Sequence, residues 1–324
     1  MKKQFCLFIL FFLIAYFPTY SIQRSHEILN EKTNNTPSAI TWEPNGGRFG
    51  DNLLSYSKAK WLSYKSNIPL LYLPFKYSDQ LMLYEKETMY TPEAAQLFST
   101  IMHLPIGSKM QLLPYNSTLY ISHWKTEITI DWYDPTFIKE LKQNIAPRYE
   151  IEKTIAPNDC ISVAAHVRTG GGFIVDNEQE RERCPLRFAP DEFFIDQIAR
   201  IAEMFPEQNL YVHIFTDHQN PLFLKQKFEK ALNNPRITFG CRTQDNYHNA
   251  NVLEDFFSMM DFNCLIRPGS HYSRFVQRLG NNKLVIYPES IRKTADGKSI
   301  IDVINIKTRA NNTERWKTKK VTIV

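Results

Sequence analysis

Three glycines stand together in a chain that has few of them. Residues 166–172 read HVRTGGG, although the 324 residues contain only 11 glycines. Glycine is kept where the backbone must take a positive φ or come close to another group. Arg168 can bind a phosphate through two parallel hydrogen bonds, and the loop amides can add to the same anion. The segment is therefore either a ligand loop or a flexible surface loop.

Further polar side chains stand at predicted strand ends. His166 lies two residues before Arg168, hence on the same strand face, either as a ligand-binding residue or as a core histidine. The next predicted strand ends in Thr216 and Asp217. The Asp217 carboxylate can bind ribose hydroxyls, a base edge or an arginine, or it can cap the helix predicted near Pro221.

The segment 254–275 carries a third polar group. Asp255 lies in the first turn of a predicted helix, where a carboxylate favours the helix dipole even without a function. Gly269 and Ser270 open the next predicted helix, whose N-terminal amides form an anion site. His271 and Arg274 follow within its first turns.

The elements that must position these residues alternate regularly from residue 159 onward. Strands are predicted over 160–167, 210–217, 236–241, 264–269 and 283–288, with helices between them. Such alternation predicts a parallel sheet covered on both faces, with ligands beyond the carboxyl ends of its strands. Before residue 150 we expect a glycine-rich loop at 46–52 opening a helix, strands at 68–75, 119–124 and 127–133, and a helix over 135–147.

Composition restricts the class of partner. The net charge is +5, but basic and acidic residues are interspersed except in the C-terminal tail around RWKTKK (315–320), which argues against nucleic acid and fits a small anionic ligand. The four cysteines beyond residue 6 lack zinc or redox spacing and form either two disulfides or buried thiols. Residues 1–21 have the pattern of a secretory signal or a membrane anchor, followed by a linker over 22–38. The chain is therefore expected to be exported or membrane-anchored.

Four segments resemble, in order, motifs of the α1,2-, α1,6- and protein O-fucosyltransferase superfamily. GGRFGDN (46–52) is similar to its N-terminal glycine-rich motif, and HVRTGGG to its donor motif. FTD (215–217) is similar to its Thr-Asp strand end, and 254–275 to its third motif. Chance matches would not be expected to keep this order along alternating strands and helices.

The resemblance implies an α/β fold of the GT-B type, with two Rossmann-type domains facing across a cleft. Residues 39–150 would form the acceptor-side domain and 151–295 the nucleotide-sugar domain, a parallel sheet with helices on both faces, followed by an extension over 296–324. The implied activity is inverting, metal-independent transfer of a sugar from a GDP-sugar, GDP-fucose above all, to a glycan or protein hydroxyl, without a cofactor. Arg168 would anchor the diphosphate. The implied donor-binding residues are Gly47, Arg48, Gly50, Asn52, His166, Gly170, Gly171, Thr216, Asp217, Asp255, Ser270, His271 and Arg274.

The chain departs from the motifs at several positions. Thr169 stands in place of a second arginine, and Gly171 in place of an acidic residue. Asp51 stands where asparagine is usual, so we expect it to act as the general base that takes the acceptor's proton, unless it only caps the helix. The rival bases are Glu43, Asp176, Glu178 and His271.

A second class of function stays open. The chain can be an exported, non-catalytic protein that binds carbohydrate or nucleotide and keeps the glycosyltransferase fold. Thr169 favours this alternative, because it removes a cation from the donor motif. The presence of Arg168, Asp217, Ser270 and Arg274 favours the enzyme.

Overall fold

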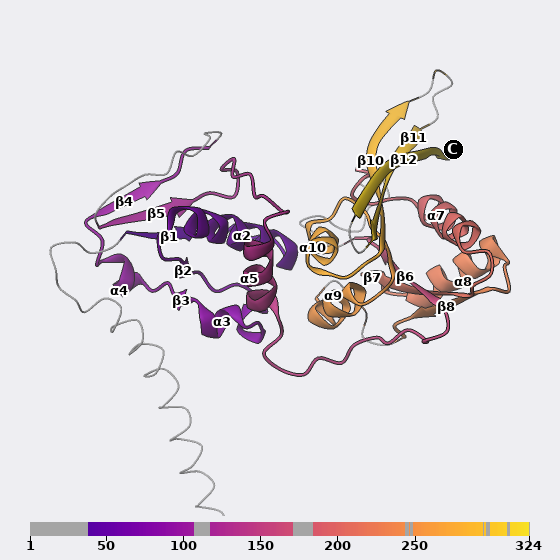
Figure 1. Cartoon of the computed structure of the whole chain (residues 1–324), viewed down its shortest axis with the longest axis horizontal. Helices are drawn as coiled ribbons and strands as arrows, with labels where there is room; N and C mark the ends of the chain where they lie inside the picture. The colour runs from indigo at the N-terminus through magenta and orange to yellow at the C-terminus, as the bar shows by residue number, and fades with distance from the viewer. Residues whose placement is uncertain are drawn as a thin grey trace, which may run out of the picture. The chain divides into compact units, whose positions relative to one another are not determined.

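The computed structural model describes residues 38–106, 117–170, 184–243, 246, 249–293, 295, 299–309 and 312–323. The chain divides into two compact units, residues 1–149 and 150–324 (Figure 1). The predicted signal or anchor over 1–21 lies outside the described ranges, as does the predicted linker up to residue 37. Within the described ranges, no helix is long and apolar enough to cross a membrane.

The first unit contains two small parallel sheets. Strands β1 (Ala39–Trp42), β5 (Thr118–Ser122) and β4 (Thr100–His103) form one, in the order β1-β5-β4, and β2 (Leu71–Tyr72) pairs with β3 (Thr88–Met89) in the other. Because β1, β5 and β4 run parallel, their carboxyl ends lie at one edge of the sheet. The helices are α2 (Phe49–Ser66), η1 (Ser78–Gln80), α3 (Leu83–Lys86), α4 (Pro92–Ala95) and α5 (Pro135–Ile145).

Helix α2 begins inside the predicted glycine loop, at Phe49. Gly46 has a φ of +61°, a conformation that glycine adopts at little cost. A Cβ atom on Gly47 would lie 2.5 Å from that of Asp51, so the loop folds back tightly on the first turn. Along the helix, Leu53 and Tyr56 are fully buried. This burial fixes the loop at the amino end of α2.

The second unit contains a seven-stranded sheet in the order β12-β11-β10-β9-β6-β7-β8. Its strands are β6 (Ile161–Val167), β7 (Leu210–Thr216), β8 (Ile237–Cys241), β9 (Cys264–Ile266), β10 (Leu284–Lys293), β11 (Ser299–Arg309) and β12 (Asn312–Ile323). The five strands β10-β9-β6-β7-β8 are parallel. This is the strand order of a Rossmann-type sheet: from β6 the chain first adds β7 and β8 on one side, and then β9 and β10 on the other. The order of the strands therefore reverses between β6 and β9.

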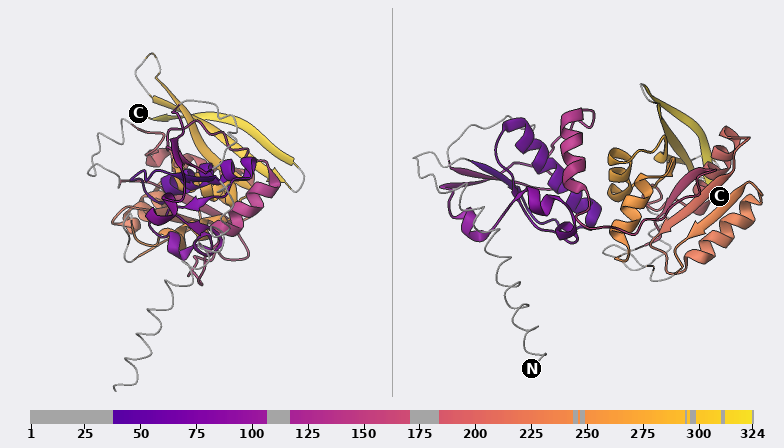
Figure 2. Two further views of the ribbon diagram at one scale, coloured as in Figure 1. Left: turned by 90° about the vertical axis from the view of Figure 1, so that its left-hand side faces the viewer. Right: turned by 60° about the horizontal axis from the view of Figure 1, so that its bottom comes forward.

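Helices cover both faces of this sheet, as predicted. Figures 1 and 2 show α7 (Asp191–Met204) and α8 (Pro221–Leu232) on one face, and α9 (Val252–Met260) and α10 (His271–Leu279) on the other. Sequence explains the helix boundaries: Pro221 stands at the first position of α8, and the Asn220 side chain caps it by accepting the Phe223 N–H. Asp217 is therefore not the cap of this helix, contrary to one alternative from the sequence.

The carboxyl-terminal residues complete the sheet. β11 pairs antiparallel with β10, and β12 pairs antiparallel with β11. Ile301 and Val303 of β11 are fully buried in the same apolar core as β6 and β7. Residues beyond 295, predicted as an extension, thus contribute to the core of the second unit.

Two further expectations differ from the structure. Residues 127–133, predicted as a strand, pair with no other strand of the described chain. The side chains in this segment alternate in exposure, and Ile130 is buried. The alternation of apolar and polar residues that predicted a strand therefore arises from side-chain packing, without strand pairing. Cys160, Cys184, Cys241 and Cys264 are free thiols, which removes the two-disulfide alternative, and only Cys264 of these four is buried, so the expectation of buried thiols holds for that residue alone.

Candidate functional site

The loop after β6 is fixed by a carboxylate on the adjacent strand. Asp217 follows β7, and its Oδ1 accepts the Thr169 N–H at 2.7 Å and the Gly170 N–H at 3.3 Å. The Thr169 hydroxyl donates to the same oxygen at 3.2 Å. Register explains the contact, because Val167 pairs with Thr216. The structure thus brings Arg168, Gly170 and Asp217 together, with Asp217 shaping the loop.

Arg168 is 9% exposed and lies against an aromatic ring. Its Cζ is 5.3 Å from the centroid of Phe188, within range of a cation–π contact. Two residues before Phe188, the Leu186 carbonyl accepts the Gly269 N–H at 2.6 Å. A Cβ on Gly269 would lie 2.9 Å from that carbonyl oxygen, so glycine is needed for this close approach. Residues 186–188 therefore link the loops that follow β6 and β9.

Ser270 is the N-cap residue of α10 and is 4% exposed. Its side chain makes no capping hydrogen bond, and no acidic residue stands in the first turn of α10. A helix N-terminus of this kind favours an anion through its amides and dipole. His271 and the exposed Arg274 lie in the first turns of the helix.

Two arginines, one beside this helix and one in its last turn, were not predicted from the sequence as site residues. Arg267 comes directly after β9, is 4% exposed, donates to Gln277 Oε1 at 2.8 Å and packs its guanidinium 4.2 Å from the Tyr287 ring centroid. Burial and the positive charges of Arg274 and Arg278 lower the Arg267 pKa to about 9. The Arg274 side chain reaches solvent, but neighbouring atoms partly desolvate it, and this desolvation together with the charge of Arg278 lowers its pKa. Three cations therefore share one region. The sequence pattern that could have predicted this group is an arginine directly after a strand, followed by two arginines four residues apart on the next helix.

The other predicted donor residues lie around this edge with partners of their own. The His166 ring is 5.4 Å from that of Tyr272, which donates through its hydroxyl to the Val252 carbonyl at 2.6 Å. Asp255 accepts from Arg242 at 2.7 Å. Burial raises the Asp255 pKa to about 6 although Arg242 opposes the shift. Asp255 is therefore engaged in an ion pair.

In the first unit, the glycine-rich loop is held by its own side chains. Asn52 donates its amide to the carbonyls of Gly47 at 2.7 Å and Arg48 at 3.2 Å. Asp51 lies in the first turn of α2, and Arg48 is the N-cap residue. Asp51 is thus not the N-cap residue of this helix. Gly50 is buried in the same turn.

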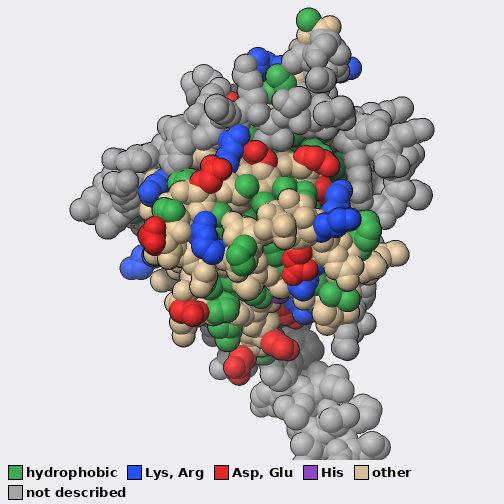
Figure 3. Space-filling model, turned by 90° about the vertical axis from the view of Figure 1, so that its right-hand side faces the viewer, with side chains coloured by type: hydrophobic (Ala, Val, Ile, Leu, Met, Phe, Trp, Pro, Cys, Tyr) green, Lys and Arg blue, Asp and Glu red, His purple; other side chains and the backbone are tan. Residues whose placement is uncertain are grey.

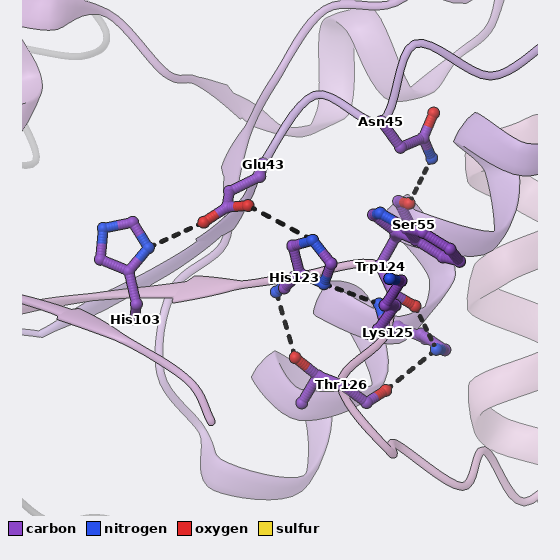
Figure 4. Close-up of polar contacts among 9 residues, drawn as sticks. Glu43, Asn45, Ser55, His103, His123, Trp124, Lys125 and Thr126 are labelled. Atoms are coloured by element: carbon purple, nitrogen blue, oxygen red, sulfur yellow. Dashed lines mark hydrogen bonds and ion pairs between the residues drawn. The ribbon is translucent and has the colours of Figure 1, made fainter. Parts of the chain in front are cut away.

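A second polar cluster lies at the carboxyl ends of β1, β4 and β5 in this unit (Figure 4). The Glu43 carboxylate is 2.8 Å from Nδ1 of His103 and 3.8 Å from Nε2 of His123. Asn45, two residues after Glu43, donates to Ser55 Oγ at 2.7 Å. Sequence reasoning named Glu43 but neither histidine, because only the strand pairing brings the three side chains together.

Three predicted residues, Gly171, Asp176 and Glu178, lie outside the described ranges. In the part of the chain that the structure describes, no three His, Cys, Asp or Glu side chains are grouped so that they could hold a metal ion. On the face shown in Figure 3, Lys and Arg side chains are interspersed with Asp and Glu. This distribution agrees with the charge pattern of the sequence.

The strand order and the loops at its reversal define an α/β protein with a Rossmann-type second unit. No known family model matches the sequence, and no curated protein matches it. Solved structures that are similar to the chain include the NodZ α-1,6-fucosyltransferase soaked with GDP-fucose, with 11% identity and a TM-score of 0.45 over 87% of this chain and 99% of that one. They also include POFUT1 in complex with GDP-fucose, with 10% identity and a TM-score of 0.45 over 78% of this chain and 97% of that one.

Proposed function

We propose that this chain is a glycosyltransferase that moves a sugar from a GDP-sugar to a glycan or protein hydroxyl. The group formed by Arg267, which follows β9, and by Arg274 and Arg278 along α10 is the observation that carries the proposal. Besides burial, the charges of Arg274 and Arg278 lower the pKa of Arg267, and the charge of Arg278 lowers the pKa of Arg274, so an anion bound there would relieve this repulsion. A nucleoside diphosphate has the matching charge.

The same charges can assist the reaction. When the bond between the sugar and the diphosphate breaks, negative charge accumulates on the leaving phosphate. Fixed cations and amides aimed at that oxygen lower the energy of the transition state. The Arg168 loop and the amino end of α10 supply such groups at the reversal of the sheet, where Rossmann-type sheets bind ligands. We therefore propose transfer that requires no metal ion or other cofactor and inverts the sugar carbon.

GDP-fucose is the donor we propose, on the basis of the four ordered motifs. Arg168 would grip the diphosphate through its guanidinium fork. Asp217 would act through the loop backbone it holds, leaving the ribose and base to other groups. The N-terminal segment 1–21 would direct export or anchor the chain at a membrane, so we place the enzyme in a compartment that receives nucleotide sugars.

One observation favours the non-catalytic alternative, a carbohydrate- or nucleotide-binding protein. Thr169 occupies the position of the second arginine, and its hydroxyl donates to Asp217. That position therefore contributes no positive charge to a bound diphosphate. A binding protein would retain the nucleotide without breaking the sugar–phosphate bond.

Turnover distinguishes the two functions. The full chain is incubated with GDP-fucose and a panel of glycan and protein acceptors, and released GDP is measured with and without a chelator. The enzyme is expected to release GDP in both conditions and to give a fucosylated product with inverted anomeric configuration. Binding of GDP-fucose without release, with water or any acceptor, would establish the binding protein instead.

A further inference from the structure

Three parallel strands deliver one carboxylate and two imidazoles to a single edge of the first unit. Glu43 follows β1, His103 ends β4, and His123 follows β5. The Glu43 N–H donates to the Ser122 carbonyl at 3.0 Å, which fixes the exit of β1 against β5. Figure 4 shows Glu43 between the two histidine rings. The rigid sheet, rather than a loop, thus sets the spacing of these groups.

The hydrogen bonds assign the proton positions on His103. An ionised carboxylate only accepts hydrogen bonds, so Nδ1 of His103 must be the donor across the 2.8 Å to Glu43 Oε1. In the neutral imidazole, the other ring nitrogen, Nε2, then carries a lone pair. No hydrogen bond is made to Nε2 within the described part of the chain, and the His103 side chain is 64% exposed. A basic nitrogen is thus presented to solvent in one orientation.

His123 lies on the other side of Glu43. Its Nδ1 accepts the Lys125 N–H at 3.0 Å, so a neutral ring carries its proton on Nε2, the nitrogen that faces Glu43 Oε2. The His123 N–H donates to Thr126 Oγ1 at 3.1 Å, and Thr126 is fully buried. These contacts fix the ring, and its Nε2 lies 3.8 Å from Glu43 Oε2, beyond hydrogen-bond distance but within the range of an ion pair. Both imidazoles therefore turn an N–H toward Glu43.

Apolar side chains lie exposed beside this group. Trp124 adjoins His123 in the chain, with ring centroids 5.5 Å apart, and is 49% exposed. Ile101, on the same strand face as His103, is 55% exposed. An exposed indole next to polar groups can stack on the C–H face of a sugar ring while its neighbours bind hydroxyls. The surroundings suit a carbohydrate.

We propose that His103 is the general base for the acceptor and that Glu43 is its positioning residue. This assignment rests on the proposed glycosyl transfer. His103 Nε2 takes the proton of the acceptor hydroxyl as the hydroxyl oxygen forms a bond to the anomeric carbon. The bond from that carbon to the diphosphate breaks, and its electron pair leaves with GDP. The imidazolium later returns its proton to water. Trp124 binds the apolar face of the acceptor sugar.

This assignment differs from the expectation for Asp51. The Asp51 carboxylate lies in the first turn of α2 against Gly47, where a carboxylate stabilises the helix through its dipole even without a catalytic role. The His103 ring has an ordered partner and an exposed nitrogen. The two residues can be compared in one experiment.

The experiment measures GDP release from GDP-fucose, with water and with the glycan acceptors, together with GDP affinity by calorimetry. The variants are His103→Gln, His103→Ala, Glu43→Gln, Trp124→Ala and Asp51→Asn, with Thr100→Ala on the exposed strand β4 as control. We expect His103→Gln to lower kcat by roughly a hundredfold or more at unchanged GDP affinity, and added imidazole to restore part of the loss in His103→Ala. We expect Glu43→Gln to lower kcat. Trp124→Ala should raise KM for the acceptor more than it lowers kcat. The activities of Asp51→Asn and Thr100→Ala should stay within a few-fold of the parent.

Each contrary result has a separate meaning. Near-parent kcat in His103→Gln, or a loss confined to Asp51→Asn, would overturn the base assignment alone. A kcat loss in His103→Ala that imidazole leaves unchanged, accompanied by a lower melting temperature, would show a merely structural role and also overturn it. Absence of GDP binding or of GDP release in the parent chain would overturn the proposed function, and the base assignment with it.

Discussion

Asp217 acts in the candidate site through backbone groups. Its Oδ1 accepts from the amides of Thr169 and Gly170 and from the Thr169 hydroxyl. A carboxylate that accepts from backbone N–H groups makes stronger bonds than a neutral acceptor. The shape of the loop that carries Arg168 thus depends on one side chain of the next strand.

We expect Asp217→Ala to lower the free energy of unfolding by about 1–3 kcal/mol, because two partly buried amides lose their acceptor. GDP affinity should fall as well, since the loop is no longer fixed. Asp261→Ala is the matched control, because its ion pair with Lys153 is exposed on both sides and such pairs contribute little. Urea unfolding and calorimetry measure both quantities. Equal effects in the two variants would contradict the role given to Asp217.

Sequence reasoning identified the residues of this loop more readily than their partners. Strand ends could be predicted from apolar runs, so Arg168, Thr216 and Asp217 were expected at one edge. The sequence could not decide whether Asp217 binds a ligand, an arginine or a helix, since that depends on the register of β6 against β7. Likewise His103 and His123 lie far apart in sequence from Glu43, and only β1, β4 and β5 bring them together.

Strands β7 and β8 show how one element constrains the next. His213 pairs with Gly240 in the ladder, and a Cβ on Gly240 would lie 2.9 Å from His213 Nδ1 and 2.2 Å from the Tyr211 hydroxyl. A side chain at this position of β8 would therefore have to displace the Tyr211 hydroxyl and the His213 ring. The His213 ring, 8% exposed, packs 4.6 Å from that of Phe215, and Nδ1 lies 3.0 Å from the Tyr211 hydroxyl.

Burial, helped by the positive charge of Arg242, lowers the pKa of His213 to about 4 from an ordinary 6.5. A histidine with a depressed folded-state pKa contributes stability that is present above pH 6.5 and is lost as the pH falls through 4. We expect about 3 kcal/mol of acid destabilisation from this group. His213→Phe should remove it, so the free energy of unfolding of the parent should fall by about 3 kcal/mol more than that of the variant between pH 7 and pH 4. A constant difference across this range would be contrary to the expectation.

The parallel part of the second sheet could be predicted because each strand is an apolar run and each helix has its own boundary signals. β11 could not be assigned in the same way. Its buried Ile301 and Val303 find their place only when β10 offers an edge for antiparallel pairing. For the segment 127–133 a strand was predicted that the structure does not contain, because alternating burial occurs there without a partner strand.

At the level of the molecule, the formal charge of +5 is modest and spread along the chain. Folding concentrates part of it, bringing Arg267, Arg274 and Arg278 into mutual electrostatic contact. The linking segment 186–188 joins this group to the Arg168 loop. No composition statistic indicates such a concentration, because it depends on strand order and on the turn between β9 and α10.

The most direct test of the central claim is calorimetric titration of the full chain with GDP, repeated for Arg168→Lys. Arg200→Lys is the control, because Arg200 forms an ion pair with Asp196 on the surface of a helix. The parent and the Arg200 variant should bind GDP more tightly than GMP or UDP, and saturating GDP at a hundredfold its Kd should add about 2.7 kcal/mol to stability. Arg168→Lys should fold normally and bind GDP at least tenfold more weakly, because an ammonium cannot reproduce the bidentate contact. Undetectable GDP binding by the parent, or equal affinity in the Arg168 variant, would contradict a nucleotide-sugar site at this edge of the sheet.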